Sequence, residues 1–393
     1  MDRFNAPTAG TLVDYTLRLI AASSPSGREA AVANVIGSEM EALGLDVCVD
    51  EYGSVVGTVE AEPGPCVLLD CHIDTVGVAD ADDWHWDPSG ERVDSRIYGR
   101  GAVDMKGPLA AALYGVAGLK PYVTAGRVVI AGTVAEELVE GPALKKVVER
   151  VEPDYVVICE ATNLGLARGQ RGRAELLVDV IGRSSHTSRP DLGANAAEVF
   201  ADVAIALRQV PLRSHPMLGH GVLVLSDVMS RPYPGLSVVP YSCRATYDRR
   251  TLPGETREEV VSPLQAAADK AAAGTGARVT ITIAEDVFTT YTGAQVTAEN
   301  FAPAWICEDQ AEILVAASSG LRLAGLPAEL TQYAFCTNGS ATAGELGIPT
   351  IGFGPGREDL AHCANEYVEI ADLSTAAIGY AGIIQVLLDK GQS

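Results

Sequence analysis

Hydrophobic residues recur at helical spacing in two stretches near the start of the chain, residues 10–22 and 28–43. The turn-forming run Ser24-Pro-Ser-Gly27 separates the two stretches. The pattern therefore predicts two helices joined by a short loop. The same spacing predicts further helices over residues 109–119 and 143–151.

Short, continuous apolar runs lie near residues 67, 128 and 155. Runs of this kind are typical of strands in a sheet that is covered on both faces. Because these strands alternate with the predicted helices, the sequence indicates an α/β domain with three layers and a mixed sheet in the middle.

The order of predicted helices and strands changes between residues 173 and 290. The pattern there predicts, in order, a strand, a helix, two strands, a helix and a strand, at residues 174–182, 194–209, 221–230, 238–249, 256–273 and 278–286. This βαββαβ order is ferredoxin-like. We therefore predict one domain built from residues 1–172 and 291–393, into which a second domain, residues 173–290, is inserted.

Residues that can bind metals or transfer protons stand at or near the ends of the apolar runs, or in loops. At such positions, side chains from neighbouring strands can converge. Seven candidates fall outside the inserted segment, in residues 1–172 and 291–393, which therefore form the predicted catalytic, metal-binding domain. They are His72, Asp74, Asp104, Glu136, Glu137, Glu160 and His362.

These residue types suit a pair of divalent metal ions. Such a pair needs a bridging carboxylate, one or two terminal ligands for each ion, and open positions for water and substrate. Asp104 can bridge. His72 with Glu160 can complete one site, and Glu137 with His362 can complete the other.

Glu136 is then left as a carboxylate beside the metals. It is placed to take a proton from a bridging water and later give it to a leaving amine. Adjacent residues on an extended chain point in opposite directions, so a turn must re-aim Glu136 or Glu137. Asp74 lies two residues beyond His72, and we expect it on the same strand face, accepting the hydrogen bond that fixes the imidazole tautomer.

Five motifs together carry a family resemblance that covers essentially the whole chain in the right order. They are Asp70-Cys-His-Ile-Asp74, Tyr98-Gly-Arg-Gly-Ala-Val-Asp-Met-Lys-Gly107, Ala135-Glu-Glu137, Cys159-Glu160 and Ala361-His362. The sequence resembles the dizinc amidohydrolase and metallopeptidase family that contains acetylornithine deacetylase, succinyl-diaminopimelate desuccinylase, aminoacylase and the glutamate carboxypeptidases. Within it, the runs 168–175 and 336–344 look closest to hydrolases linked to selenium metabolism.

The resemblance implies roles for residues in the inserted domain. His186 matches a histidine that reaches into the partner subunit's active site and stabilises the tetrahedral oxyanion; the alternative is a surface loop histidine. Arg250 matches an arginine that binds the substrate carboxylate, for which a guanidinium fork is well suited. Because two arginines are adjacent, Arg249 could bind the substrate carboxylate in place of Arg250. The alternative role for Arg250 is an ion pair with Asp248.

The resemblance also implies that Asn195 and Ser340 bind substrate, because both positions lie on the substrate side of the family pattern. Asn195 matches in Gly193-Ala-Asn195-Ala, although it could instead hold the loop. Ser340 stands in a loop, Gly339-Ser-Ala-Thr342, that replaces a commoner Gly-Thr-Asp pattern. Because this change lies on the substrate side, it leaves the metal chemistry intact and weakens the assignment of any named substrate.

The resemblance implies two zinc ions, with cobalt or manganese as substitutes, and a homodimer in which the inserted domain is both lid and dimer contact. The predicted function is metal-dependent hydrolysis of an amide bond in an N-acyl amino acid or small peptide. A deacylase is the first interpretation. A dipeptidase or carboxypeptidase, a carbamoylase, and a catalytically inactive metal- or ligand-binding protein remain open.

Composition agrees with a large enzyme. The 393 residues include 47% hydrophobic residues, enough for two cores. The net charge of −22 argues against nucleic acid or an anionic membrane as a partner. The chain starts without a leader pattern and has no run near the ~20 apolar residues of a membrane span, so we expect a cytoplasmic protein.

Overall fold

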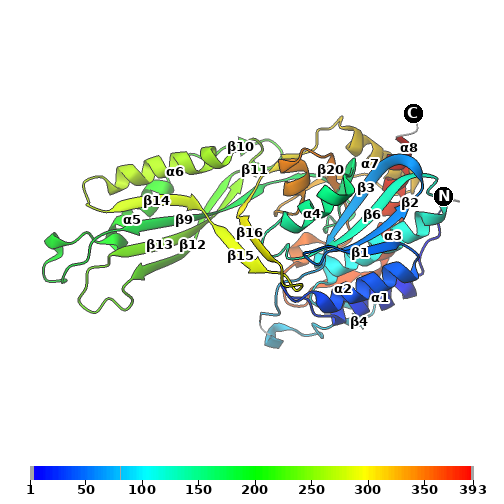
Figure 1. The fold of residues 1–393 in the computed structure, drawn as a ribbon, viewed down its shortest axis with the longest axis horizontal. Coiled ribbons are helices and arrows are strands. Elements are labelled where there is room, and N and C mark those ends of the chain that lie inside the picture. Colours follow the sequence, from blue (N-terminus) through cyan, green and yellow to red (C-terminus); the bar gives the residue numbers. More distant parts are fainter. Residues whose placement is uncertain (1–3, 80, 391–393) are drawn as a thin grey trace. The chain divides into compact units, whose positions relative to one another are not determined.

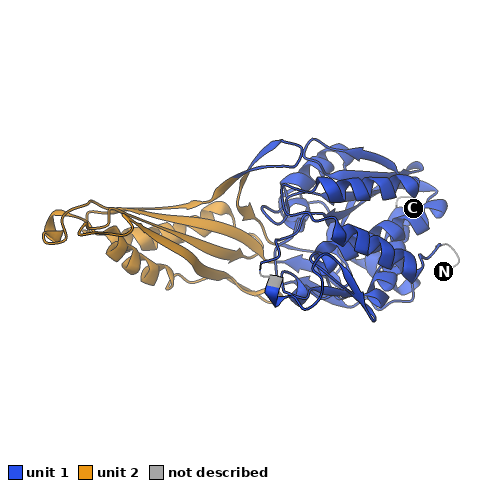
Figure 2. Ribbon diagram, turned by 90° about the horizontal axis from the view of Figure 1, so that it is seen from below, with its two compact units in different colours: residues 1–170, 287–297, 305–393 blue, residues 171–286, 298–304 orange. Residues whose placement is uncertain are grey.

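The computed structural model describes residues 4–79 and 81–390, and these form two compact units. Unit 1 contains the described residues of 1–170, 287–297 and 305–393, and unit 2 contains residues 171–286 and 298–304 (Figure 2). Unit 1 is interrupted in sequence by unit 2. Each unit has a hydrophobic core of its own.

A nine-stranded sheet forms the centre of unit 1 (Figure 1). Its strands follow the order β1-β2-β6-β3-β7-β20-β8-β18, with β19 paired to β8. They span β1 Asp46–Val49, β2 Val55–Glu60, β3 Glu62–His72, β6 Ala125–Thr133, β7 Tyr155–Ile158, β8 Leu166–Gln170, β18 Trp305–Ile306, β19 Leu330–Tyr333 and β20 Thr350–Gly352. β3 runs parallel to both β6 and β7, whereas β2 is antiparallel to β6, so the sheet is mixed as predicted.

Helices cover both faces of this sheet. They span α1 Ala9–Ala21, α2 Ala30–Ala42, α3 Gly107–Leu119, α4 Pro142–Val151, α7 Glu312–Leu323 and α8 Ile370–Lys390. Successive residues of β3 point to opposite faces: Leu69 belongs to the core with α1, α3 and α8, and Leu68 to the core with α4. The three-layer α/β prediction is confirmed.

The central strands bring their C-terminal ends to one edge of the sheet. β3, β6 and β7 are mutually parallel and hydrogen-bonded in register, with His72 opposite Thr133 and Asp70 opposite Ile158. The loops that leave these strands therefore start side by side, at the edge where ligands are bound in open α/β sheets.

Unit 2 has the βαββαβ order that the sequence predicts. Its elements are β9 Gly172–Ile181, α5 Ala196–Leu207, β12 Val222–Arg231, β13 Ser242–Thr251, α6 Arg257–Ala272 and β14 Arg278–Ile283. The strands form an antiparallel sheet in the order β12-β13-β9-β14, with short β17 (Phe301–Ala302) beside β9. α6 begins at a capping box in which Thr256 and Glu259 hydrogen-bond each other's backbone N–H groups.

Two ribbons and a small sheet complete the structure. β4 Glu91–Val93, β5 Arg96–Tyr98 and β21 Tyr367–Glu369 form a three-stranded sheet. β10 Ser214–His215 pairs with β11 Gly219–His220, and β15 Glu285–Thr289 pairs with β16 Gln295–Glu299.

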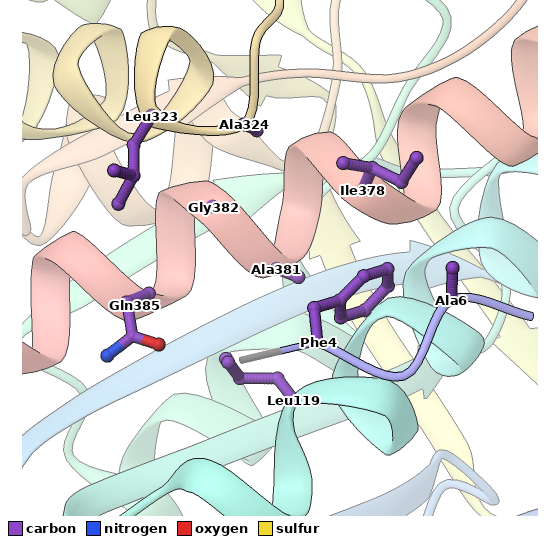
Figure 3. A pocket seen from close by; sticks show the side chains of 9 residues that line it. All are labelled: Phe4, Ala6, Leu119, Leu323, Ala324, Ile378, Ala381, Gly382 and Gln385. Carbon is purple, nitrogen blue, oxygen red and sulfur yellow. The ribbon is translucent and has the colours of Figure 1, made fainter. Parts of the chain in front are cut away.

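Helix α8 departs from one expectation drawn from the sequence. By length and composition it could cross a membrane, with 21 residues and a mean hydropathy of 1.5 in its most apolar window. However, 56% of that window is buried inside the structure, as in the core helix of a globular domain. α8 also borders a pocket of about 290 Å³ whose lining includes Phe4, Leu119 and Ile378 (Figure 3). Gln385 alone among the residues labelled there has a polar side chain, so this pocket lacks groups for metal binding or proton transfer.

Candidate metal centre

The structure brings together the five ligands that the sequence predicts, all within unit 1. His72 ends β3, and Glu160 stands two residues after the end of β7. Asp104 lies in the kinked segment Ala102–Lys106 that precedes α3, and its own φ and ψ are not helical. Glu137 follows β6, and His362 follows a short helical turn, Glu358–Leu360.

Asp104 is shared between the two histidines. Its Oδ1 lies 2.8 Å from Nε2 of His72, and its Oδ2 lies 3.1 Å from Nε2 of His362. Each oxygen of one carboxylate thus faces a different imidazole. This is the geometry of a carboxylate that can bridge two cations.

Each histidine also faces a glutamate of its own. Nε2 of His72 lies 3.2 Å from Oε1 of Glu160, and Nε2 of His362 lies 3.0 Å from Oε2 of Glu137. These pairs are consistent with two donor sets, His72 with Asp104 and Glu160, and His362 with Asp104 and Glu137. Donor atoms of His72, Asp104 and Glu137 also lie within 4.8 Å of one another, so Glu137 is close to both sets. In each set the atoms are close enough that one cation could replace the proton between them.

The charge of the cluster fits two divalent cations. Asp104, Glu136, Glu137 and Glu160 supply four carboxylates in a small, largely buried volume. Burial raises the pKa of Glu160 to about 7, because its charged form loses water. At Asp104 burial has the same tendency, but hydrogen bonds from His362 and His72 prevail and lower its pKa. Mixed imidazole and carboxylate donors of this kind suit zinc and similar transition metals.

The tautomer of His72 is fixed by its other ring nitrogen. Nδ1 lies 2.9 Å from the backbone carbonyl oxygen of Asp74, which can only accept, so Nδ1 carries the proton and Nε2 is free for a cation. The sequence pattern predicted the Asp74 carboxylate in this role. The residue is the predicted one, but its nearer atom is the backbone carbonyl: β3 ends at His72, and Oδ1 of the carboxylate lies 3.5 Å from Nδ1.

The Asp74 carboxylate also holds the backbone of the two adjacent glutamates. Its oxygens accept hydrogen bonds from the N–H groups of Glu136 and Glu137, each at 3.1 Å. The hydroxyl of Ser26 donates to it as well, at 2.7 Å. The turn expected at this point is present, because Ala135 has a left-handed φ of 57°.

Glu136 lies beside the donor sets without belonging to them. It is 8% exposed, and its carboxylate makes none of the ion pairs with His72 or His362 that Glu160 and Glu137 make. Burial raises the pKa of Glu136 well above its ordinary value, and the neighbouring acids Glu160, Glu140 and Glu137 add to this, although His72 opposes it. A carboxylate with a raised pKa accepts protons more readily.

Three predicted residues lie in unit 2, apart in sequence from the metal ligands. His186 is exposed, and its Nδ1 accepts from the backbone N–H of Ser188 at 3.1 Å, which leaves Nε2 as the donor of the neutral ring. Asn195 caps α5, its side-chain oxygen accepting from the N–H groups of Ala197 and Glu198. Asn195 thus holds its loop, the second role considered for it.

The arginine doublet on β13 divides between two environments. Arg249 is buried and donates to Glu255 at 2.6 Å, in an ion pair whose side chains are 3% and 5% exposed. Arg250 is 29% exposed and pairs with Asp248, in agreement with the alternative interpretation. Because Asp248 is also partly exposed, Arg250 can exchange this partner for a ligand, whereas Arg249 cannot leave Glu255 without stranding a buried charge.

Ser340 is buried in unit 1. Its hydroxyl accepts a hydrogen bond from Nε2 of Gln170 at 2.8 Å and lies 3.2 Å from the Cys336 sulfur. Two residues before it, Asn338 donates to Oδ2 of Asp70 at 3.0 Å. The loop that contains Asn338 and Ser340 is therefore tied to the strand that carries His72.

Two buried carboxylates were not singled out by the sequence pattern. Asp70 accepts from Thr133 at 2.8 Å and from Asn338, and burial raises its pKa to about 6. Glu366 accepts several hydrogen bonds from the segment that carries Asp104. The available signal was local: each acid lies within four residues of a histidine that the sequence predicts as a ligand.

Comparison with known proteins agrees with this arrangement. Residues 68–386 match the peptidase family M20/M25/M40. An uncharacterized protein of Escherichia coli strain K12, YgeY, is 34% identical over 381 residues, which cover 93% of this chain and 91% of YgeY. The acetylornithine deacetylase of Aliivibrio fischeri strain MJ11 is 26% identical over 378 residues, 90% of this chain and 93% of that enzyme.

Solved structures share the fold. A tripeptidase from Staphylococcus aureus superposes with a TM-score of 0.78 at 21% identity, covering 98% of this chain and all (100%) of its own. The YXEP protein of Bacillus subtilis, described as a dinuclear metal binding peptidase, gives a TM-score of 0.72 at 15% identity, with 97% of this chain and 98% of its own covered.

Proposed function

The chain belongs to peptidase family M20/M25/M40, and on that premise we propose that it hydrolyses the amide bond of an N-acyl amino acid. The proposed enzyme is a deacylase with two divalent cations. Zinc is the first choice, and cobalt or manganese are substitutes. The observation that carries the proposal is the Asp104 carboxylate shared between His72 and His362, with Glu136 beside it.

The cations, when bound, supply Lewis acidity to the scissile carbonyl and lower the pKa of a water molecule. His72, Asp104 and Glu160 would hold one, and His362, Asp104 and Glu137 the other. Glu136 takes the proton of the attacking water, which adds to the carbonyl carbon. The same carboxyl group then gives that proton to the departing nitrogen as the carbon–nitrogen bond breaks.

Two further residues are proposed to act on the substrate. The neutral ring of His186 has its Nε2–H available, and this donor would stabilise the oxyanion of the tetrahedral intermediate. Arg250 would bind the carboxylate of the amino acid product with its guanidinium fork. Asn195 and Ser340 support the loops on the substrate side, Asn195 by capping α5 and Ser340 through Gln170.

A homodimer is part of the proposal. β12 is an edge strand of the unit 2 sheet. Four large apolar residues on it are exposed, among them Val224 at 50% and Met229 at 53%. An unpaired edge with exposed apolar side chains favours pairing with a second copy of the same strand. His186 would then be supplied to the site of a partner subunit.

A peptidase of the same family is the second candidate. The deacylase interpretation draws support from the likeness to an acetylornithine deacetylase, whereas the structural likeness to a tripeptidase favours short peptides. Both reactions use the same cations and the same proton acceptor. They differ in the group on the acyl side of the scissile bond, which is a simple acyl group in one substrate and an aminoacyl group in the other.

The test combines metal analysis with a substrate panel. The protein is loaded with zinc, its metal content is measured by mass spectrometry, and release of free amine is followed from N-acetyl amino acids, N-succinyl amino acids and dipeptides. We expect two metals per chain and turnover of an N-acyl amino acid. Turnover of dipeptides alone would establish the second candidate. Two metals without turnover of any amide, or no metal at all, would favour a binding protein.

A further inference from the structure

Glu366 holds the backbone of the segment that carries Asp104. Its side chain is 0% exposed. One carboxylate oxygen accepts from Arg100 Nη1 at 2.6 Å and from the Gly101 N–H at 3.1 Å. The other accepts from the N–H groups of Val103 at 2.8 Å and Asp104 at 3.1 Å. All four bonds to this acid come from residues 100–104.

The segment depends on these bonds because its own conformation offers few alternatives. Gly101 has a left-handed φ of 86°, and Asp104 lies outside helical geometry, with φ −126° and ψ 89°. Residues 101 to 104 are buried. Without Glu366, three backbone N–H groups would lose their acceptor away from water, and a buried donor without a partner is costly.

Glu366 also belongs to the segment that carries His362. It stands four residues after that histidine and directly before β21, which pairs with β5 so that Tyr367 lies opposite Tyr98. His362, at one end of this segment, places its Nε2 3.1 Å from Asp104 Oδ2. Glu366, at the other end, accepts from the backbone N–H of Asp104.

We propose that Glu366 is a positioning residue, which sets the place of Asp104 relative to His362 and thereby the affinity for cations. It contacts neither cation nor substrate. The inference rests on the proposed function in taking Asp104 and His362 as ligands, but it concerns cation binding and needs no turnover to be tested.

The matched pair of variants is Glu366→Gln and Glu369→Gln. Glu369 lies on the same segment and also pairs with an arginine, accepting from Arg96 Nε at 2.7 Å and from Ser95 at 3.0 Å, but it does not contact residues 100–104. In Glu366→Gln an amide NH₂ replaces one acceptor oxygen and faces two donors. Zinc binding to the cation-free full-length chain is measured by calorimetry, and stoichiometry by mass spectrometry after desalting.

We expect Glu366→Gln to bind at least one of the two zinc ions about tenfold more weakly than Glu369→Gln does, the size of effect found for groups that orient metal ligands. Affinities for both ions equal to those of Glu369→Gln would overturn the inference. Absence of zinc binding by the unaltered protein would overturn the proposed function and remove the role of Glu366 with it.

Arg100→Lys separates positioning from general stability. This change disturbs the same buried ion pair but leaves the three backbone bonds to Glu366, so zinc affinity should stay near that of the unaltered protein even where the melting temperature falls. An equal loss of affinity in Arg100→Lys and Glu366→Gln would contradict positioning through Asp104. If Glu366→Gln does not fold, Glu366→Asp replaces it, because the shorter side chain keeps the charge and withdraws the acceptor, and the same loss is expected.

Discussion

The carboxylate of Asp74 accepts a hydrogen bond from the backbone N–H of Glu136 at 3.1 Å. A second bond, from Glu137, uses the other oxygen. One buried acid thereby orients two adjacent glutamates whose surroundings differ, since Glu137 pairs with His362 and Glu136 does not. Asp74 is thus tied to both the proposed proton acceptor and a proposed ligand.

Replacing Asp74 by asparagine should reduce turnover strongly. Asparagine keeps one acceptor oxygen and turns an NH₂ group toward the other N–H, so one glutamate loses its anchor. We expect kcat/KM to fall about 10- to 100-fold, as is typical when a group that orients metal ligands is changed. Ser26→Ala is the control, because it removes a single donor to Asp74 and leaves both anchoring bonds in place. An equal effect of the two variants would argue against the anchoring role.

Glu136→Gln should abolish most turnover while the protein keeps its cations. Glutamine cannot accept the proton of the attacking water, and loss of such a group typically costs about 10²- to 10⁴-fold in rate. Steady-state kinetics and metal analysis on the same sample test this. Glu149→Gln is the control, since the Glu149 side chain is 67% exposed and forms a surface ion pair with Lys146. Unchanged turnover in Glu136→Gln would contradict the role of Glu136 as the proton acceptor.

Removing the cations should destabilise unit 1. Four carboxylates would then face one another with only two imidazoles between them, and mutual repulsion disfavours the folded state. A cation at about a thousandfold excess over its Kd adds ~4 kcal/mol to the free energy of unfolding. The melting temperature of chelator-treated protein should therefore rise when zinc is added back. Glu160→Gln should show a smaller rise, and an equal rise would place zinc elsewhere.

The two neighbouring arginines should respond differently to truncation. Arg249→Ala leaves Glu255 as a buried, unpaired charge and should cost about 3–5 kcal/mol of stability. Arg250→Ala should leave stability nearly unchanged, because its ion pair is partly exposed, and should raise KM for a substrate with a free carboxylate. Thermal unfolding and KM measured on both variants decide the matter. A raised KM in Arg249→Ala with no change in Arg250→Ala would reverse the assignment.

His186 can be tested by mixing variants. If it acts in the site of a partner subunit, His186→Ala and Glu136→Ala homodimers are each inactive, but a mixed dimer contains one intact site. Each parent lacks one group, the oxyanion donor in His186→Ala and the base in Glu136→Ala. When equal amounts pair at random, co-refolding or co-expression should restore up to about one quarter of the unaltered activity. Mixed dimers without activity would place the action of His186 within its own chain or exclude it.

Much of the molecule could be predicted from the sequence because the relevant signals are local. Apolar periodicity predicts α1 to α4 and the six elements of unit 2 within a few residues, since side-chain spacing directly reflects helix or strand geometry. The metal-binding side chains that follow β3, β6 and β7 could also be identified from local sequence. Parallel strands deliver their C-terminal residues to one edge, so His72, Glu137 and Glu160 were expected to meet.

Strand alternation also separates Arg249 from Arg250. Adjacent strand residues face opposite ways, and the structure places one in a buried ion pair and the other in a partly exposed one. What alternation could not supply was the partner of each side chain. Glu255 reaches Arg249 only because the chain turns back after β13.

The sequence by itself therefore determined the fold, the family and the types of residue that meet at the candidate metal centre. Only the tertiary structure decided how those residues are held. The Asp74 carboxylate lies near His72 as expected, but it also accepts from the backbone N–H of Glu136, 62 residues away, and Glu366 accepts from the N–H of Asp104 across 262 residues. The physical reason is that a backbone N–H looks the same at every position in a sequence. Which buried acid accepts from it depends on how distant segments cross, and that is settled only when the chain has packed.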